Sequence, residues 1–388
     1  MIEFKIDDYN YIEPWNIPFE IRLKSLLSGE LKIAYFYEQP NNSTFRYRAF
    51  NMSEALNLET EGFVSASFFF LFDLAESRSI VESADFLVVC RSRYSLELDC
   101  LIRRFQSQRK KVFFDIDDLV FNINCINVLL DTLDFDLRST QTLDEWFAYV
   151  GRIGKTMMMC DGVITTNSFL AEQIIEYSKL PVAVIPNFLN RAQQQFSSEI
   201  TSAKNRGDFT SDGRRSIGYF SGSPSHKLDF KIVVPALCSL LNEDDSIDLV
   251  IAGYIDPDIS LLQFSNRIKY FPFRDYINLQ KLIASVDINL VPLQDNVFTN
   301  CKSDLKYFEA GIVGVPSVAS PVFSYRSSIC HEKNGYLALS YQWEKTIRNA
   351  LDNSTSSSEI AEQAHIHSLN VYSWNAQTST IINTLLAF

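Results

Sequence analysis

The stretch SDLKYFEAGIVGVPSVAS (residues 303–320) carries the clearest local pattern in this chain of 388 residues. Its first nine residues have the pattern of a helix that begins at Ser303. The apolar residues from Val315 to Ser320 have the pattern of a short buried strand. A helix followed by a buried strand is typical of a parallel sheet covered by helices, so the stretch predicts an α/β fold.

The same alternation of apolar and helix-like runs continues outward from this stretch. In the C-terminal half we predict strands at 216–222, 247–254, 267–273, 287–293 and 316–320. In the N-terminal half we predict strands at 31–37, 85–90, 111–121, 161–166 and 182–187. Helix-like runs separate them at 51–58, 94–108, 143–159, 236–241 and 276–286 and after Ser168. The chain therefore predicts two parallel sheets in tandem.

Length and composition predict two domains with a cleft between them. A chain of 388 residues at 46% hydrophobic exceeds one comfortable core. We predict an N-terminal domain at 1–187, a solvent-facing connection at 188–215 that is polar and weakly periodic, and a C-terminal domain at 216–388. The last helices could pack back on the N-terminal domain, and STSSS (354–358) is expected as a brief polar connector.

The net charge excludes several classes of partner. It is -12, with a sequence pI near 4.9, so no basic field exists to hold nucleic acid or an anionic membrane. The seven scattered cysteines indicate buried thiols in a reducing compartment. The first residues lack the basic start and apolar stretch of a secretory signal, and the longest apolar runs fall far short of the roughly 20 residues that span a bilayer. We expect a cytoplasmic chain with at most peripheral contact with the inner face of a membrane.

The 303–320 stretch also has the chemistry of an anion site. Ser303 is a good N-cap, and free backbone N–H groups at a helix start attract an anion such as diphosphate. Lys306 adds a positive charge on the first turn. Glu309 lies nearly two turns further along, where its carboxylate could accept hydrogen bonds from ribose hydroxyls. The alternative is an ordinary capped helix whose Lys306 and Glu309 form an exposed ion pair.

These residues resemble the donor-site helix and following strand of the group 1, or family 4, glycosyltransferases. The resemblance implies the GT-B fold, in which two Rossmann-like domains face each other across a cleft. It implies transfer of a hexose or deoxyhexose from a nucleotide-sugar donor to a glycan or lipid-linked saccharide acceptor, as in polysaccharide biosynthesis. No cofactor or metal is expected, and the anomeric configuration is expected to be retained.

The resemblance also assigns residues to the donor. A glutamate at the position of Glu309 typically binds the ribose in that family, and Ser303, Asp304 and Lys306 belong to the same motif. A second glutamate, eight residues earlier, contacts the transferred sugar, but this sequence has Cys301 there. The preceding loop could supply Asn296 or Asn300 as a substitute hydrogen-bonding group.

Two further segments of the C-terminal half are candidates for donor binding. The run 217–227, IGYFSGSPSHK, resembles the family's diphosphate loop, which makes Gly222, Ser223, His226 and Lys227 candidates. Its alternative is a plain β-α turn with Ser225 as N-cap. The run 267–276, RIKYFPFRDY, is similar to the loop that reads the nucleotide base, which adds Phe273 and Arg274.

In the N-terminal half, three carboxylates follow a buried-looking strand in FFDIDDLVF (113–121). Asp117 or Asp118 could orient an acceptor hydroxyl or act as a general base, the reading that we favour. The alternatives are a metal-binding Asp-x-Asp as in GT-A enzymes, a haloacid-dehalogenase-like phosphatase using Asp115 and Asp117, and a simple helix or turn cap. A non-catalytic sugar-nucleotide-binding protein is a further alternative for the whole chain.

Two arginines follow the first predicted strand, in the segment NNSTFRYR (41–48). In GT-B enzymes a loop at this place lies beside the acceptor and the leaving diphosphate. Arg46 and Arg48 could therefore stabilise the leaving charge, and we add them to the catalytic candidates. The alternative is a solvated helix start.

Overall fold

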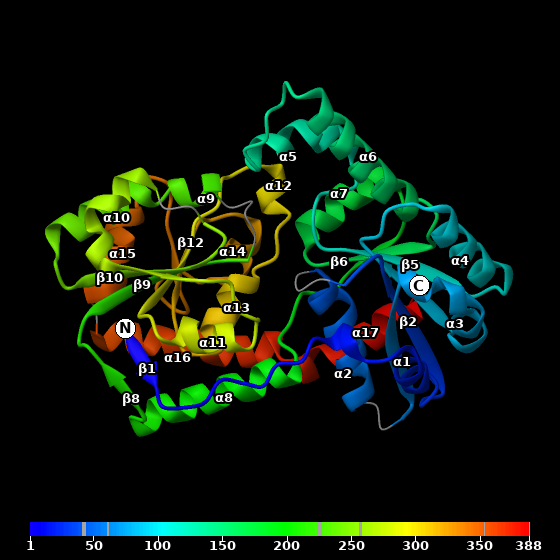
Figure 1. Cartoon of the computed structure of the whole chain (residues 1–388), viewed down its shortest axis with the longest axis horizontal. Helices are drawn as coiled ribbons and strands as arrows, with labels where there is room; N and C mark the ends of the chain where they lie inside the picture. Colours follow the sequence, from blue (N-terminus) through cyan, green and yellow to red (C-terminus); the bar gives the residue numbers. More distant parts are fainter. Residues whose placement is uncertain (41–43, 60–61, 223–226, 256–257, 353, 388) are drawn as a thin grey trace.

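The computed structural model describes residues 1–388 except 41–43, 60–61, 223–226, 256–257, 353 and 388, and it folds into two α/β lobes that lie side by side (Figure 1). Within the described residues, each lobe is built on one six-stranded parallel sheet covered by helices. This confirms the predicted fold class. None of the helices in the described ranges is long and apolar enough to cross a membrane.

The N-terminal sheet has the strand order β3-β2-β4-β5-β6-β7. Its strands are β2 (Leu31–Tyr37), β3 (Val64–Phe70), β4 (Phe86–Cys90), β5 (Lys111–Ile116), β6 (Gly162–Thr165) and β7 (Val182–Val184). The helices of this lobe are α1 (Phe19–Leu26), α2 (Asn51–Glu59), α3 (Ser77–Ser83), α4 (Leu96–Ser107), α5 (Ile126–Thr132), α6 (Thr140–Met157) and α7 (Ser168–Ser178). Both faces of the sheet are buried, which is why its strands are continuous apolar runs.

The C-terminal sheet has the order β11-β10-β9-β12-β13-β14. Its strands are β9 (Arg215–Ser221), β10 (Ile247–Gly253), β11 (Ile268–Phe271), β12 (Ile288–Val291), β13 (Ser317–Ala319) and β14 (Tyr336–Leu337). Its helices include α9 (Lys227–Lys231), α10 (Val234–Glu243), α11 (Asn278–Ala284), α12 (Val297–Asn300), α13 (Leu305–Gly311), α14 (Phe323–Ser328) and α15 (Trp343–Asp352). In chain order this is the 3-2-1-4-5-6 arrangement of a dinucleotide-binding sheet.

The strand order of each sheet reverses once, and such switch points are where open α/β sheets bind ligands. In the N-terminal sheet the reversal lies between β2 and β4, and in the C-terminal sheet between β9 and β12. The chain that follows the carboxyl ends of β2, β4, β9 and β12 lines one shared cavity. The fold therefore brings the two switch points together.

Each end of the chain packs against the lobe formed by the opposite half of the sequence (Figure 1). The N-terminal strand β1 (Ile2–Phe4) pairs antiparallel with β8 (Phe209–Ser211) beside the C-terminal lobe. The long helix α16 (Ser354–Tyr372) runs under the C-terminal lobe, and α17 (Trp374–Ala387) then packs on α2 of the N-terminal lobe. At the crossing, Leu189 N–H donates to the Tyr372 carbonyl at 2.8 Å.

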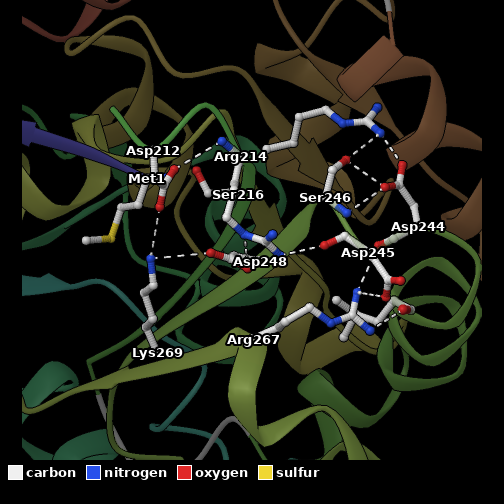
Figure 2. A network of polar contacts seen from close by, with 12 residues as sticks. Met1, Asp212, Arg214, Ser216, Asp244, Asp245, Ser246, Asp248, Arg267 and Lys269 are labelled. Carbon is white, nitrogen blue, oxygen red and sulfur yellow. Dashed lines mark hydrogen bonds and ion pairs between the residues drawn. The ribbon is translucent and has the colours of Figure 1, made fainter. Parts of the chain in front are cut away.

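Ion pairs fasten the N-terminus to the C-terminal lobe, as Figure 2 shows. The Met1 ammonium donates to Asp212 at 2.8 Å, and Lys269 lies 3.4 Å from the same carboxylate. Lys269 also contacts the buried Asp248 at 3.3 Å, where Arg214 pairs at 2.7 Å. The network ties the strand pair β1–β8 to the start of β10 and β11.

Two polar segments differ from the sequence prediction. The segment 188–215 was predicted to be an irregular connection, but most of it forms helix α8 (Arg191–Arg206), which Asn190 caps through its side chain. A sparse apolar row, Phe196, Ile200 and Ala203, is buried along one side of this polar helix. The STSSS segment is the first part of α16 rather than a connector.

Helix α16 lies so close to α13 that only a glycine fits between them. A Cβ atom on Gly311 would lie 2.3 Å from Ser368 Oγ and 2.9 Å from the Ala364 carbonyl oxygen. Gly311→Ala should therefore destabilise the fold by about 1–3 kcal/mol, because the two helices must move apart. The measurement is the free energy of unfolding in urea.

Gly151→Ala is the matched control for that substitution. Gly151 also lies in a helix, but the nearest atom to its Cβ position is 3.7 Å away. Alanine there should leave stability unchanged or raise it by up to about 1 kcal/mol, because glycine is a poor helix former. Equal effects of the two substitutions would contradict the close approach of α13 and α16.

Candidate functional site

A cavity of about 1060 Å³ lies between the two lobes. Its N-terminal wall includes Thr44 after β2, Arg91 after β4, and Asp117 after β5. Its opposite wall comes from the loops after β9 and β10 and from the segment that leads into α13. The volume suits a nucleotide with an attached sugar, since ligand pockets commonly measure several hundred Å³ to about 1,000 Å³.

Nine of the residues predicted for the site line this cavity. They are Arg46, Asp117, Asp118, Gly222, Phe273, Arg274, Ser303, Lys306 and Glu309. Residues from opposite halves of the chain thus meet in one place.

Glu309 is buried and held by side chains of both lobes. Arg46 Nη2 donates to Glu309 Oε1 at 3.0 Å, and the Tyr47 hydroxyl donates to the same oxygen at 2.5 Å. Gln193 approaches it at 3.5 Å. The hydrogen bonds found within the described residues all end on Oε1. The exposed i, i+3 pair with Lys306 does not form, and Oε2 is the oxygen left for a ligand.

Arg46 lies on a π-helical turn, η2 (Arg46–Phe50), of a kind that often occurs at functional sites. Its guanidinium carbon lies 4.1 Å from the centre of the Tyr47 ring and 4.2 Å from that of Tyr276. Two aromatic faces and Glu309 therefore fix the arginine at the junction of the two lobes.

Lys306 is a positive charge without a close counter-ion. Across the described residues, its Nζ has no hydrogen bond or ion pair, and it lies 5.1 Å from the centre of the Tyr219 ring. Burial lowers the pKa of Lys306 to about 8; Asp229 opposes this effect and Lys302 adds to it. An anion in the cavity would relieve the cost of this charge.

Ser303 differs from its predicted role. The N-cap of α13 is Asp304, and Ser303 Oγ is buried without a hydrogen-bond partner in the described part of the chain. The Asp304 carboxylate does not cap the helix; it accepts hydrogen bonds from Tyr372 and Ser328 beneath the site. Ser303 thus lines the cavity with a buried hydroxyl that has no partner among the described residues, whereas Asp304 anchors the helix from below.

The two aspartates after β5 are already in contact with other side chains. Thr44 Oγ1 donates to Asp117 Oδ2 at 2.9 Å, and Arg91 Nη1 donates to Asp117 Oδ1 at 3.1 Å. Asp118 lies 3.6 Å from Lys302 Nζ, which comes from the opposite lobe. Like the Arg46–Glu309 pair, this ion pair therefore joins the two lobes across the cavity.

On the other wall, backbone comes close to backbone at Gly253. Its φ is +94°, and a Cβ atom there would lie 1.9 Å from the Ser221 carbonyl oxygen. The carboxyl ends of β9 and β10 can approach this closely only because this residue is glycine. Gly222, by contrast, has open space where a Cβ would lie among the described residues.

Solved structures of similar architecture identify the fold. HepE from Anabaena, in complex with UDP and glucose, matches at a TM-score of 0.61 and 14% identity over 92% of this chain and 100% of that one. Sucrose-phosphate synthase from Thermosynechococcus elongatus matches at 0.61 and 14% over 92% and 99%. WaaG, a glycosyltransferase involved in lipopolysaccharide biosynthesis, matches at 0.61 and 14% over 92% and 100%. This chain has the GT-B fold.

Searches by sequence add nothing to this identification. No family model matches the chain, and no curated protein matches it. The sequence prediction of a GT-B fold is confirmed by architecture alone.

Arg48 does not reach the GT-B cleft, in contrast to its predicted catalytic role. The side chain is fully buried, donates from Nε and Nη2 to the two oxygens of Asp115 at 2.7 and 2.9 Å, and also contacts the Ile185 carbonyl and Asn187. Asp115 is only 1% exposed. A phosphatase nucleophile must meet its substrate, so this burial argues against the haloacid-dehalogenase alternative.

The two asparagines proposed for the sugar have structural roles. Asn296 caps α12 and donates to Thr132 of the other lobe at 2.9 Å. Asn300 accepts from Phe323 N–H at 2.7 Å and donates to Asp295 at 2.8 Å. Neither lines the cavity.

The remaining predicted residues belong to the 217–227 segment. Lys227 is 57% exposed, lies 3.8 Å from Asp134 and does not line the cavity. Ser223 and His226 lie outside the described residues.

Cys301, at the position of the expected second glutamate, is fully buried. Together with Phe298 it belongs to the hydrophobic core of the N-terminal lobe, although α12 comes from the C-terminal half. The side chain at this position therefore joins the lobes and does not contact the cleft.

Sequence reasoning missed several polar lining residues, among them Thr44, Arg91 and Lys302. Arg91 follows the predicted strand 85–90 directly, so the rule that placed Asp117 at a strand end could have found it. Its backbone is in the left-handed region at φ 34°, an uncommon conformation for arginine. Thr44 lies in the quoted segment 41–48, where the arginines drew attention first.

The structural role of Arg48 predicts a large loss of stability when it is removed. Arg48→Met leaves the Asp115 carboxylate buried without a partner, which should cost about 3–5 kcal/mol in the free energy of unfolding. The double variant Arg48→Met/Asp115→Leu should recover most of that loss. Arg78→Ala, which breaks an exposed helix pair, is the control and should change little. A single variant as stable as this control would contradict the assignment.

Proposed function

We propose that this chain is a metal-independent, retaining glycosyltransferase that moves a hexose or deoxyhexose from a UDP-sugar to a glycan or lipid-linked saccharide. The proposal rests on one observation above all: the GT-B cleft places an unpaired lysine and a free hydroxyl opposite two carboxylates. The first pair suits a diphosphate, and the second suits an acceptor hydroxyl. We also propose a cytoplasmic location near a membrane face.

The donor would lie along the C-terminal wall. Lys306 and Ser303 would contact the diphosphate, and the open backbone at Gly222 would allow a phosphate to come close. Glu309 Oε2 would accept from the ribose, while Arg46 and Tyr47 hold Oε1. Phe273 and Arg274 would lie near the base. The UDP and glucose bound by HepE, a neighbour with the same fold, support the choice of UDP.

Charge on the leaving diphosphate would be stabilised by protein groups. The ammonium of Lys306 lies in a half-buried place without a close counter-ion, so its attraction to phosphate is stronger than that of an exposed lysine. Arg46 also lines this cavity, but Glu309 balances its charge at 3.0 Å. The charge of Lys306 is what supports metal independence.

The acceptor would approach from the N-terminal wall. Asp117 accepts from Thr44 and Arg91 through both of its oxygens. Asp118, by contrast, accepts from the Leu119 N–H at 3.0 Å through Oδ1 and, among the described residues, has only Lys302, at 3.6 Å, near Oδ2. We therefore assign the orientation of the acceptor hydroxyl to Asp118.

Binding of UDP can be separated from folding at Lys306. Without UDP, Lys306→Met should be at least as stable as the native chain, because it removes a poorly compensated charge. UDP in the presence of EDTA should raise the melting temperature of the native chain and of Lys227→Met, and should raise that of Lys306→Met much less. The measurement is thermal denaturation with UDP, GDP, CMP, dTDP and ADP.

Other outcomes of that experiment would point elsewhere. Stabilisation by another nucleotide would change the donor, and stabilisation only with a divalent cation would contradict metal independence. Nucleotide binding without release of UDP from any UDP-sugar would favour a non-catalytic binding protein.

UDP affinity should depend on pH through Lys306. The folded-state pKa of about 8 lies below the unfolded value of about 10.4, so the ammonium is present below pH 8 and lost above it. UDP affinity should fall about tenfold as the pH rises through 8, because a charged hydrogen bond is lost. Over the same interval the stability of the unliganded chain should rise, because the unfolded chain binds the extra proton. Calorimetric titration on both sides of pH 8 measures the affinity.

Lys306→Met is the control for this pH dependence. It should bind UDP weakly, with an affinity that does not change across pH 8. An equal fall in the native chain and in this variant would assign the dependence to another group.

A further inference from the structure

We infer that the end of the cleft beneath α5 and α6 is a subsite for a neutral saccharide, in which Trp146 and Phe135 form the surface that contacts the sugar ring. The inference rests on the proposed function and names the class of acceptor. Figure 1 shows α5 and α6 projecting from the N-terminal lobe, with α5 beside α12. Trp146 lies on α6, and Phe135 lies in the connection between the two helices.

The aromatic surface is built from side chains that hold one another. The ring centres of Trp146 and Phe135 are 5.4 Å apart at 62°, and Tyr149 lies 5.6 Å from Trp146 on the next turn. Trp146 and Phe135 line the cavity, and Phe135 is 44% exposed. Exposed aromatic faces with a fixed orientation suit the C–H face of a sugar ring, which is apolar.

Hydrogen-bonding groups lie next to this surface. Burial lowers the pKa of Arg91, but Tyr149, Asp117 and Asp118 together raise it above its usual value. Tyr149 therefore lies close to the arginine. The hydrogen bonds of Arg91 to Thr44 and Asp117 both use Nη1. Within the described residues, Nη2 and Nε of Arg91 have no hydrogen-bond partner. A sugar on the aromatic surface would therefore have guanidinium donors and carboxylate acceptors for its hydroxyls.

The charges of this end of the cleft favour an uncharged ligand. Arg91 pairs with Asp117 at 3.1 Å, and Lys302 pairs with Asp118 at 3.6 Å. Two cations and two anions balance, whereas Lys306 at the donor end has no such partner. An acceptor with a phosphate or carboxylate at this end would meet a carboxylate beside each cation. A neutral hexose would instead exchange hydrogen bonds with all four groups.

Contacts between the lobes fix the position of this surface. Thr132, at the end of α5, accepts from Asn296 at 2.9 Å, and its carbonyl accepts from Gln294 at 3.1 Å. Phe298 of α12 lines the cavity below, and Lys302 Nζ lies 4.5 Å from the centre of its ring. The aromatic surface is therefore held against the C-terminal lobe, next to the ion pair that spans the cleft.

The test measures the release of UDP by the native chain and by three variants of α6. The donors are UDP-glucose, UDP-galactose and UDP-N-acetylglucosamine. The acceptors are the methyl glycosides of glucose, galactose and mannose, with methyl glucuronide and glucose 6-phosphate as charged counterparts. Trp146→Leu keeps apolar volume without an aromatic face, and Trp146→Phe keeps an aromatic face. Phe147→Leu is the matched control, because Phe147 is 45% exposed and does not line the cavity.

We expect a neutral glycoside to raise UDP release above the rate with water alone, and the charged compounds to do so less. Trp146→Leu should raise the acceptor KM about three- to tenfold, the effect of losing one aromatic contact. Trp146→Phe should raise it less and Phe147→Leu not at all. Stabilisation by UDP should be unchanged in all three variants.

Three results would overturn the inference while leaving the proposed function intact. They are UDP release that no neutral glycoside increases, equal or better use of the charged compounds, and equal KM values in Trp146→Leu and Phe147→Leu. If Trp146→Leu does not fold, Phe135→Leu, which removes the other ring, takes its place in the comparison with Phe147→Leu, and the same criteria apply. Failure of the proposed function is distinct, since UDP would then neither stabilise the native chain nor be released from any donor.

Discussion

The pairing of the two backbone segments that cross between the lobes fixes the rest of the structure. Leu189 and Ser373 form a parallel bridge, and Leu189 N–H donates to the Tyr372 carbonyl. Because each segment is bonded to the other, neither lobe can turn about a single flexible connection. Tyr372 also donates to Asp304 at 2.5 Å and stacks on Phe308 at 4.6 Å. The crossing is therefore bonded directly to the helix that carries Lys306 and Glu309.

In this arrangement, the site is formed by side chains from both lobes. Arg46 and Tyr47 of one lobe hold the Glu309 carboxylate of the other, and Asp118 faces Lys302 across the same space. Buried charges are stable only with partners in good geometry, so the lobes must meet in one orientation for these charges to be compensated. Cys301, buried in the core of the opposite lobe, adds an apolar contact where a glutamate was expected.

The sequence was sufficient for features that depend on neighbours in the chain. Continuous apolar runs predicted the parallel strands except β3 and β14, which the sequence analysis missed, and the strand-end position predicted Asp117 and Asp118 in the cleft. It failed where a side chain is paired by distant residues. Arg46 and Arg48 are two positions apart, but Arg46 meets Glu309 in the cleft and Arg48 meets Asp115 beneath it. The polar composition of α8 concealed its helical pattern, because only three apolar residues are buried along it. Three such contacts are enough to hold a helix that packs on an existing surface of the protein.

The exchange of chain ends between the lobes has a consequence for synthesis on the ribosome. Strand β1 can pair only after β8 has been made, some two hundred residues later, since Phe4 lies opposite Phe209. The contact between α2 and α17 forms later still, because α17 is the last helix of the described chain. Contacts so distant in sequence form slowly and late. The N-terminal lobe emerges first but exposes the surface of α2 until α17 has been made, so this lobe is completed only after the C-terminal lobe has been synthesised.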